Sequence, residues 1–460
     1  MASRGDHLVR ADRGFASGAG LLGRIGAPLF ARLVDQLDRR LLTGGIEATL
    51  PNGSPRRVGF HSPGPVAIVD IRQWRALVRL ATSGSVGWYK AWVAGEWSSP
   101  DPLPLFELFA ANAVSLRNTT RAKGPARWIN RLAHRLRDNR PRQARHNIAA
   151  HYDLGNDFYA AWLDEGMTYS SARFSSPLPL AGGEEPRSGE GGGLSKANIP
   201  SPNPASRAGP PPRRSEHDAR KREGRLESAQ HRKIALLLDR LDLAPGDRLL
   251  EIGCGWGTLA IEAAKRGVCV VGLTLSTEQK AWADARIAAA GLSERIEIRL
   301  QDYRAVDEGF DAIASVEMVE AVGTRYWPAY LDCLARNLRP GGRAALQYIS
   351  IDHSLFDRYA INPDFIQTYI FPGGMLIDEP RFEALARQRD LSCEDRDGFG
   401  LDYAETLRLW RIRYDAAVAQ GRLAGFDEAF HNLWRYYLMY CEGGFRGGSI
   451  DVAQVTLSRS

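Results

Sequence analysis

A glycine-rich turn is the most specific chemical feature of the sequence. The segment LLEIGCGWGTLA places Gly253, Gly255 and Gly257 between a predicted strand and a predicted helix. Glycine lets the backbone turn sharply and approach a ligand closely, and the first N–H groups of the following helix are free to bind an anionic group. The turn therefore predicts a cofactor-binding loop, and the alternative is a purely structural glycine turn.

The residues around this turn indicate which cofactor it binds. Thr258 stands where a dinucleotide fingerprint has its third glycine, and the next predicted strand ends in GLTLS, without the acid of that fingerprint. Glu251 instead fits the E/D-x-G-x-G-x-G loop of S-adenosylmethionine (SAM) methyltransferases, in which a carboxylate meets the amino group of the cofactor. Asp302 and Tyr303 follow a later strand. The pattern predicts a SAM site, whereas a structural turn would not require the acid.

Alternating helices and strands position these residues. The periodicity predicts helices over 226–241, 258–266, 277–290 and 326–338, and strands over 248–252, 269–273, 296–300, 312–315 and 343–350. Repeated βα units with short apolar strands favour a parallel sheet covered by helices on both faces. The fold class is therefore α/β, a doubly wound Rossmann-like sheet, and its ligands are expected at the carboxyl ends of the strands.

Three further segments complete the predicted organisation. Residues 1–120 form a small α+β domain, with strands over 45–50 and 66–69 and a helix over 71–81; a catalytic domain spans 146–460. Within the latter, 177–224 is predicted to be a disordered insertion, because 16 of the 39 residues 177–215 are Pro or Gly and bury little apolar surface. A docking role for the insertion is the weaker alternative.

A basic segment links the two domains. Residues 116–145 hold ten Lys or Arg against one acid, Asp138, although the whole chain carries only +6. Over 121–145, Trp128, Leu132 and Leu136 form one apolar stripe on a predicted helix. Such a helix fits peripheral contact with an anionic membrane. A linker helix packed on the next domain is an equal alternative, and no nucleic-acid motif accompanies the charge.

Composition narrows the class of protein. With 44% apolar and 25% charged residues, the chain has the composition of a folded protein, and no run reaches the about 18 apolar residues of a membrane span. The five cysteines are odd in number and widely spaced, so neither a disulfide framework nor a structural zinc site is expected. We therefore expect a cytoplasmic protein without a bound metal.

Several ordered motifs carry a family resemblance. HYDLGNDFYAAWLDEGMTYSSARF (151–174), EIGCGWG, VVGLTLSTEQ, LQDYR, VEMVEAVG, IQTYIFPGG, DYAETLRLW and YYLMYCEGGFRGG occur in this order. The chain closely resembles the cyclopropane-fatty-acyl-phospholipid synthase family, which includes mycolic-acid and fatty-acid methyltransferases, over about 146–460. GWYKAWVAGEWSSPDPL also resembles the N-terminal lipid-binding domain of the bacterial enzymes.

The resemblance implies a residue set for SAM. Tyr169 and Ser170 would cap the cofactor, and the loop from Leu249 through Glu251 to Gly257 would line its methionine arm. Thr274, Leu275, Ser276 and Gln279 would take the ribose, and Asp302 and Tyr303 the adenine. Helix capping is the structural alternative for Ser276 and Gln279.

The resemblance also implies the chemistry. The family methylates an alkene with SAM, and a base then removes a proton from the new methyl group of the resulting carbocation so that a cyclopropane ring closes. A bound bicarbonate serves as that base, and here Glu320, Tyr403 and the backbone of Ile349 would hold it. Ser171 and Gln347 stand where many members have cysteine and histidine; both can still donate to an oxyanion. A surface or salt-bridging acid is the alternative for Glu320.

Two further groups of residues are expected near the acyl chain. Cys441 matches a cysteine often assigned to the active site, and a pocket-lining role is expected for it. Aromatic faces stabilise cations, and the C-terminal part is rich in them, although core packing is the prediction for most. They are Tyr369, Phe371, Tyr403, Trp410, Tyr414, Tyr436 and Tyr437.

The resemblance implies that the protein forms cyclopropane rings on unsaturated acyl chains of phospholipids. It also implies a location at the cytoplasmic face of the inner membrane and, as in related enzymes, a homodimer. Ser171 and Gln347, with IQTYIFPGG, also resemble the branch that makes methylene- or methyl-branched fatty acids. Two other classes remain open: a small-molecule N- or O-methyltransferase, and a SAM-binding lipid protein without turnover.

Overall fold

A computed structural model describes residues 4–5, 8, 34–116, 154–175 and 216–459. The predicted basic helix 121–145 and residues 177–215 of the predicted insertion lie outside this part of the chain. Within the described residues, no helix is long and apolar enough to cross a membrane.

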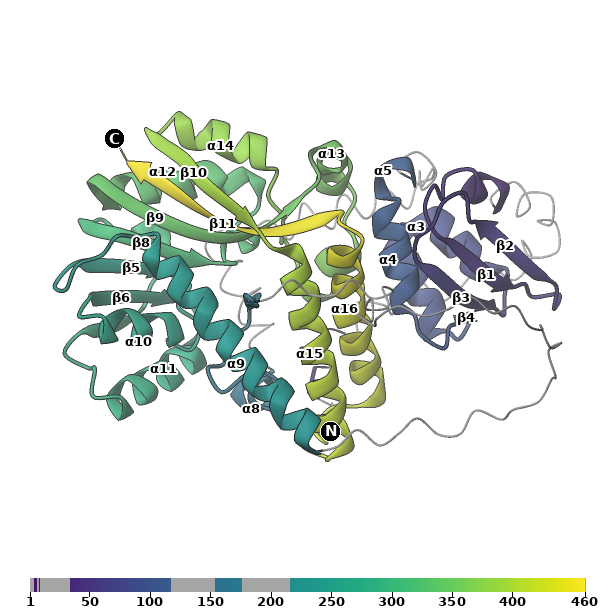
Figure 1. The fold of residues 1–460 in the computed structure, drawn as a ribbon, viewed down its shortest axis with the longest axis horizontal. Coiled ribbons are helices and arrows are strands. Elements are labelled where there is room, and N and C mark those ends of the chain that lie inside the picture. Colours follow the sequence, from purple (N-terminus) through teal and green to yellow (C-terminus); the bar gives the residue numbers. More distant parts are fainter. Residues whose placement is uncertain (1–3, 6–7, 9–33, 117–153, 176–215, 460) are drawn as a thin grey trace, which may run out of the picture.

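The smaller lobe is an N-terminal α+β unit, at the right of Figure 1. Its four-stranded sheet has the order β2-β1-β3-β4, in which β1 is parallel to β3 and antiparallel to β2. The elements are β1 (Gly45–Thr49), β2 (Pro55–Gly59), β3 (Val66–Ile71), α3 (Arg75–Val93), β4 (Trp97–Ser98), α4 (Leu103–Ala111) and α5 (Ala113–Leu116). The helix predicted to start at Ile71 starts at Arg75, because the alternating run VAIVDI continues β3 through that residue.

The larger lobe contains a seven-stranded sheet of order β10-β11-β9-β8-β5-β6-β7. The five strands β7, β6, β5, β8 and β9 run parallel to one another. Strand β11 pairs with β9 in the antiparallel direction, and β10 pairs with β11 in the same way. The strands are β5 (Arg248–Ile252), β6 (Cys269–Thr274), β7 (Ile296–Leu300), β8 (Phe310–Val316), β9 (Leu338–Ile351), β10 (Leu391–Gly398) and β11 (Ile450–Arg459). The five predicted strands and the Rossmann-like class are thus confirmed.

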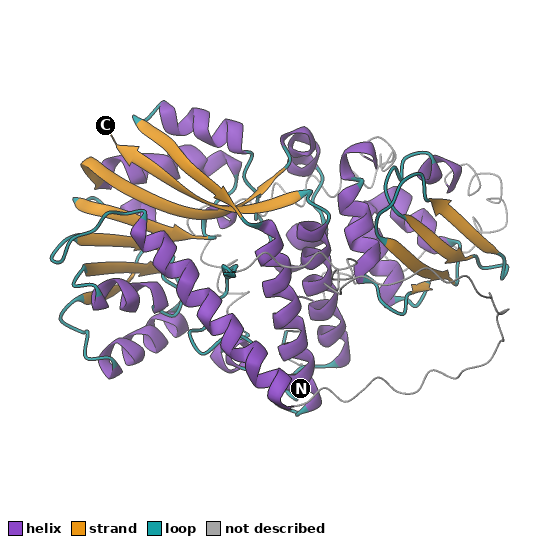
Figure 2. Ribbon diagram, in the orientation of Figure 1, coloured by secondary structure: helices purple, strands orange, loops and turns teal. Residues whose placement is uncertain are grey.

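Helices cover both faces of this sheet (Figure 2). One face packs on α9 (Glu216–Asp239), α10 (Thr258–Lys265) and α11 (Thr277–Ala289), and the other on α12 (Trp327–Asn337) and α14 (Glu379–Arg387). Successive residues of β5 pack on opposite faces of the sheet. Leu249 belongs to the core with α9, α10 and α11, and Leu250 belongs to the core with α12 and α14. Short elements surround the cofactor end: α8 (Asn156–Ala160), η2 (Tyr303–Ala305), η3 (Val319–Ala321), η4 (Thr324–Tyr326), α13 (His353–Ile361) and η5 (Ile366–Ile370).

Helix α9 is longer than predicted. It begins at Glu216 rather than near residue 226, so residues 216–224, which the sequence analysis assigned to the disordered insertion, belong to a helix. This stretch, EHDARKREG, contains no proline and consists mostly of good helix formers, whereas the Pro/Gly-rich sequence ends before it.

Two long C-terminal helices join the lobes. Helices α15 (Gly400–Ala419) and α16 (Glu428–Arg446) lie between the seven-stranded sheet and the N-terminal unit (Figure 1). Helix α16 packs on α4, and one apolar core is continuous from β3 and α3 through α15 and α16. The N-terminal unit therefore shares its apolar core with the larger lobe.

Candidate active site

A cavity of about 990 Å³ lies where the carboxyl ends of β5, β6 and β8 meet the helices that join the lobes. Its wall combines the glycine loop after β5 with residues of α3, α4 and α16. The order β6-β5-β8 makes this the switch point of the sheet, since the connections after β5 and β8 leave in opposite directions. One cavity thus joins the predicted cofactor site to the N-terminal unit.

The glycine loop has the backbone that the sequence predicts. Gly253, Gly255 and Gly257 all have positive φ, at 85°, 51° and 83°. A Cβ on Gly253 would lie 2.8 Å from Met318 Cγ, whereas at Gly255 it would meet no atom within 4 Å. Gly255 therefore faces open space in the cavity wall, as a loop that approaches a cofactor requires.

Glu251 offers an unpaired acceptor beside this loop. Its side chain is buried, and Oε2 has no hydrogen-bond partner within the part of the chain that the structure describes. Burial raises the pKa of Glu251 to about 8, against the opposing effect of Lys233. Such an acceptor fits the cofactor's ammonium group. Leu249, however, packs in the sheet core and does not line the cavity, so its side chain takes no part in this site.

The predicted ribose residues divide into two groups. Thr274, Leu275 and Gln279 line the cavity, and Thr274 Oγ1 donates to Gln279 Oε1 at 2.9 Å. Ser276 does not line it; its Oγ accepts from Gln279 N at 3.2 Å and caps α11. The structure thus gives Ser276 the capping role that was the alternative for it.

The adenine residues lie at the end of β7. Asp302 and Tyr303 both line the cavity. The Asp302 carboxylate is paired with Arg304, 2.6 Å from Oδ2 to the guanidinium, which orients the acid at the cavity wall. Together with the open loop and the unpaired Glu251 oxygen, these donors and acceptors fit SAM.

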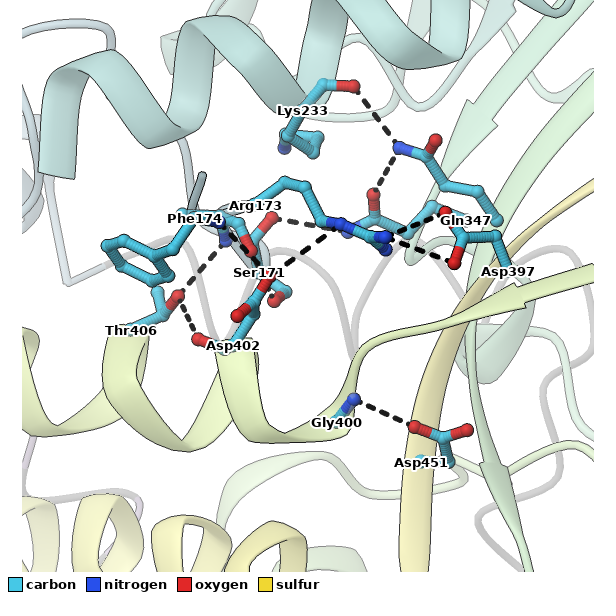
Figure 3. Close-up of polar contacts among 12 residues, drawn as sticks. Ser171, Arg173, Phe174, Lys233, Gln347, Asp397, Gly400, Asp402, Thr406 and Asp451 are labelled. Carbon is cyan, nitrogen blue, oxygen red and sulfur yellow. Dashed lines mark hydrogen bonds and ion pairs between the residues drawn. The ribbon is translucent and has the colours of Figure 1, made fainter. Parts of the chain in front are cut away.

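The segment 169–174 begins in the cavity wall. The hydroxyls of Tyr169 and Tyr437 lie 2.8 Å apart, and Ser170 Oγ accepts from Lys233 Nζ at 2.6 Å; Tyr169 and Ser170 line the cavity. Figure 3 shows how the rest of the segment is fastened: Arg173 contacts Asp397 of β10, and the Phe174 N–H donates to Asp402 of α15.

Glu320 and the backbone of Ile349, which were each expected to hold a bicarbonate, contact each other directly. The Ile349 N–H donates to Glu320 Oε1, and Oε2 of this carboxyl accepts no hydrogen bond from any described residue. Burial, and next the charge of Glu317, raise the pKa of Glu320 to about 8. Both residues line the cavity, so Glu320 is no surface acid.

The other residues expected to hold an oxyanion converge on an acid that the sequence analysis missed. Glu317 Oε1 accepts from Ser171 N at 2.8 Å and from Gln347 Nε2 at 2.7 Å, and Oε2 accepts from Tyr403 Oη at 2.6 Å. Ser171 and Gln347 are 0% and 1% exposed and do not line the cavity, whereas Glu317 does. These donors therefore serve a carboxylate of the chain itself.

The remaining candidates are pocket or core residues. Cys441 lines the cavity, and burial raises the pKa of its thiol far above the ordinary value, so it remains protonated. Of the seven aromatic residues singled out in the sequence, four line the cavity: Phe371, Tyr403, Tyr436 and Tyr437. The other three, Tyr369, Trp410 and Tyr414, are buried in the core. Among the described residues, no cluster of His, Cys, Asp and Glu could hold a metal ion.

Comparison with known proteins agrees with this geometry. A family model described as mycolic acid cyclopropane synthetase matches residues 139–181 and 219–455, and the unmatched interval falls within the predicted insertion. The chain is 39% identical over 389 residues to the tuberculostearic acid methyltransferase of Mycobacterium tuberculosis, covering 83% of this chain and 80% of the relative.

Two further relatives extend the comparison. The chain is 34% identical over 312 residues to the cyclopropane-fatty-acyl-phospholipid synthase of Escherichia coli K12, covering 67% of this chain and 66% of that one. The crystal structure of the mycolic acid cyclopropane synthase CmaA1 complexed with SAH and CTAB superposes with a TM-score of 0.54 and 28% identity, covering 68% of this chain and 98% of that one.

Proposed function

Because the chain belongs to the mycolic acid cyclopropane synthetase family and is a SAM-dependent methyltransferase, we propose that it modifies unsaturated acyl chains of phospholipids. The proposed reaction adds one carbon to a cis double bond and closes a cyclopropane ring. The observation that carries the proposal is one cavity that joins the glycine loop to the carboxyl groups of Glu317 and Glu320 and to apolar residues of α3 and α4.

The site provides what an alkene reaction needs. SAM, when bound, supplies an electrophilic methyl group to the double bond. The apolar wall keeps water from the acyl cation, and the rings of Phe371, Tyr403 and Tyr437 can face it. The carboxyl groups of Glu317 and Glu320 lie in the same wall, where a proton must leave the added methyl group.

A methylene- or methyl-branched product is the second candidate. Loss of the same proton gives either a ring or an exocyclic methylene, according to geometry. Ser171 and Gln347 stand where many family members have cysteine and histidine, and the relative with 39% identity is a tuberculostearic acid methyltransferase. The methylene branch needs no residue that the ring does not use, whereas a methyl branch requires a second reaction in which a separate hydride donor reduces that methylene.

Fatty-acid profiling tests the proposal. The chain would be expressed in a bacterium that makes unsaturated phospholipids and has no cyclopropane synthase of its own. The matched control is the double variant Glu317→Gln/Glu320→Gln, which has neither of these two carboxyl groups in the cavity wall. We expect acyl chains heavier by one CH₂ in the wild type only. Proton NMR then separates a ring, with its upfield CH₂ signal, from an exocyclic methylene.

Other outcomes would contradict the proposal. An N- or O-methylated small molecule as the sole product would indicate a small-molecule methyltransferase. SAM binding without any altered lipid would indicate a lipid-binding protein that has lost turnover. Acyl chains of unchanged mass in both samples, from cells that contain folded protein, would refute the assigned substrate class.

Access to the acyl chain requires contact with a bilayer, which we propose is peripheral. The support is the charge of 116–145 in the sequence, because basic residues near anionic headgroups contribute about 1 kcal/mol each. Cosedimentation with vesicles of anionic phospholipid should weaken as salt rises. Binding that is insensitive to salt would contradict an electrostatic contact, and dimerisation remains a prediction from the family.

A further inference from the structure

We infer that the carboxylate of Glu317 is the built-in base of this enzyme and takes the place of an external oxyanion. The inference rests on the proposed function, since it names the group that removes the proton in that reaction. It departs from the family pattern, in which a bound bicarbonate has this role.

The first support is the convergence of donors. Ser171 N, Gln347 Nε2 and Tyr403 Oη come from three separate parts of the chain and end within 2.6–2.8 Å of the two oxygens of Glu317. The family resemblance implies that these same residues hold a bound oxyanion. A carboxylate has about four acceptor positions, so three donors orient it and leave it able to accept one proton from a substrate in the cavity.

Further contacts fix the donors themselves. Gln347 Oε1 accepts from Gln454 Nε2 at 3.1 Å, and the same Gln454 amide donates to Lys233 O at 3.2 Å. Gln347 Nε2 also lies 3.3 Å from Ser171 O. The amide of Gln347 is therefore held with its NH₂ group toward Glu317, and neither it nor the Ser171 N–H can itself take a proton.

The backbone at Glu317 is the second support. Its φ is 46°, in the left-handed region that a non-glycine residue rarely adopts, and its N–H donates to Gln347 O at 2.7 Å. This strain holds a carboxylate at the carboxyl end of β8, against the cavity. Strained non-glycine residues concentrate where a side chain must be aimed at a ligand.

A comparison with the neighbouring acid, Glu320, indicates which of the two carboxyl groups is ionised. Burial raises the pKa of Glu317, but three donors and the nearby charge of Lys233 oppose that rise, whereas the carboxyl of Glu320, which accepts from Ile349 N, has a pKa raised to about 8. Two carboxylates in one apolar wall do not both ionise readily. The negative charge therefore resides on Glu317, the better solvated of the two, and Glu320 keeps its proton.

The proton transfer balances without another reagent. A C–H bond of the added methyl group breaks, its proton passes to an oxygen of Glu317, and its electron pair forms the new C–C bond of the ring at the cationic carbon. For an exocyclic methylene the same pair forms a C=C bond. The protonated Glu317 then releases its proton to water when the product leaves.

Glu317→Gly is the sharpest test, because glycine adopts the observed φ freely and leaves the three donors around an empty space of carboxyl size. We would titrate ¹³C-bicarbonate into full-length protein and follow its NMR signal. We expect no binding to the wild type and saturable binding to the variant. Asp395→Gly is the control, since Asp395 also has positive φ (51°) but is exposed on β10.

Turnover gives the second readout. In bicarbonate-free buffer we expect full activity from the wild type and a loss of roughly 10²–10⁴-fold from Glu317→Gln and Glu317→Gly, with SAM affinity within threefold. Added bicarbonate should restore the glycine variant only. Wild-type activity that depends on bicarbonate, or an active Glu317→Gln variant, would overturn the inference.

The two arms separate the inference from the function it rests on. The bicarbonate titration needs no lipid turnover, so bicarbonate bound by the wild type refutes the inference whatever the protein does to lipids. If the wild type modifies no lipid but the titration gives the expected result, the proposed function is refuted. The conclusion that the Glu317 carboxylate occupies the position of the oxyanion then still stands.

Discussion

Replacement of Glu251 by glutamine tests how the site holds SAM. The Glu251 carboxyl is buried with one oxygen unpartnered among the described residues, and its pKa is raised to about 8. At pH 7 about 90% of it is therefore protonated in the free enzyme. A bound ammonium group favours the carboxylate, so binding of SAM should release about 0.9 proton, and the glutamine variant should release none.

The affinity change follows from the same values. Loss of one partner from a buried charge pair costs about 2–5 kcal/mol, but ionising Glu251 at pH 7 already consumes about 1.4 kcal/mol of the gain. The net loss for Glu251→Gln is then about 0.6–3.6 kcal/mol, or about 3–400-fold in Kd. Between pH 6 and 8 wild-type affinity should rise with pH, by up to about tenfold per pH unit, whereas the variant should be flat.

Calorimetric titration of SAM in buffers of different ionisation enthalpy measures both quantities. The apparent enthalpy should depend on the buffer for the wild type and not for Glu251→Gln. Equal affinities within threefold, or the same proton release from both proteins, would refute the assignment of Glu251 to the ammonium group.

Three other changes test the site and the fold. The free energy of unfolding of the apo wild-type protein should fall as pH rises from about 4.5 toward 8, because Glu320, whose pKa is raised to about 8, keeps a proton that the unfolded chain releases. Glu320→Gln should reduce this slope by up to about 1.4 kcal/mol per pH unit in urea titrations. Gly255→Ala and Gly246→Ala, both at positive φ with no atom near the new Cβ, should each cost about 1 kcal/mol in thermal unfolding, but Gly255→Ala alone should weaken SAM binding. Asn112→Ala should cost about 2–4 kcal/mol, because Oδ1 accepts from two backbone N–H groups of residues 42–43, 2.7 and 3.1 Å away; a smaller change than 1 kcal/mol in urea would show that water replaces the amide.

The parallel strands could be predicted because each is a short apolar run between helices of clear period. Strands β5 and β7 match their predicted bounds, and the glycine loop lies where the strand-turn-helix pattern requires. Boundaries failed where two patterns overlap: the run 66–71 carries a strand beyond Val69 into the predicted helix. No elements were predicted after Ser350, although α15 and α16 form the wall between the lobes.

Glu317 shows why the site could be predicted only in part. It occurs in VEMVEAVG, three residues before Glu320, and two acids beside a strand end were the available signal. Its partners Ser171, Gln347 and Tyr403 are 146, 30 and 86 residues away in the chain. Periodicity indicates which face of an element a residue occupies, but the convergence of two distant side chains and one distant backbone N–H on Glu317 depends on tertiary packing.

Glu317 explains one of the two departures from the family pattern, the glutamine at position 347. A free oxyanion can be held by side chains that themselves titrate, whereas a carboxylate fixed to β8 needs neutral donors that hold it and never compete for the proton. The Gln347 amide is such a donor, whereas Ser171 donates through its backbone N–H, which a cysteine would offer equally. Because Glu317 is attached to the backbone at a strained φ of 46°, it cannot follow the substrate as a diffusing ion can. The position of the acyl cation relative to this one fixed carboxylate then selects between ring closure and an exocyclic methylene.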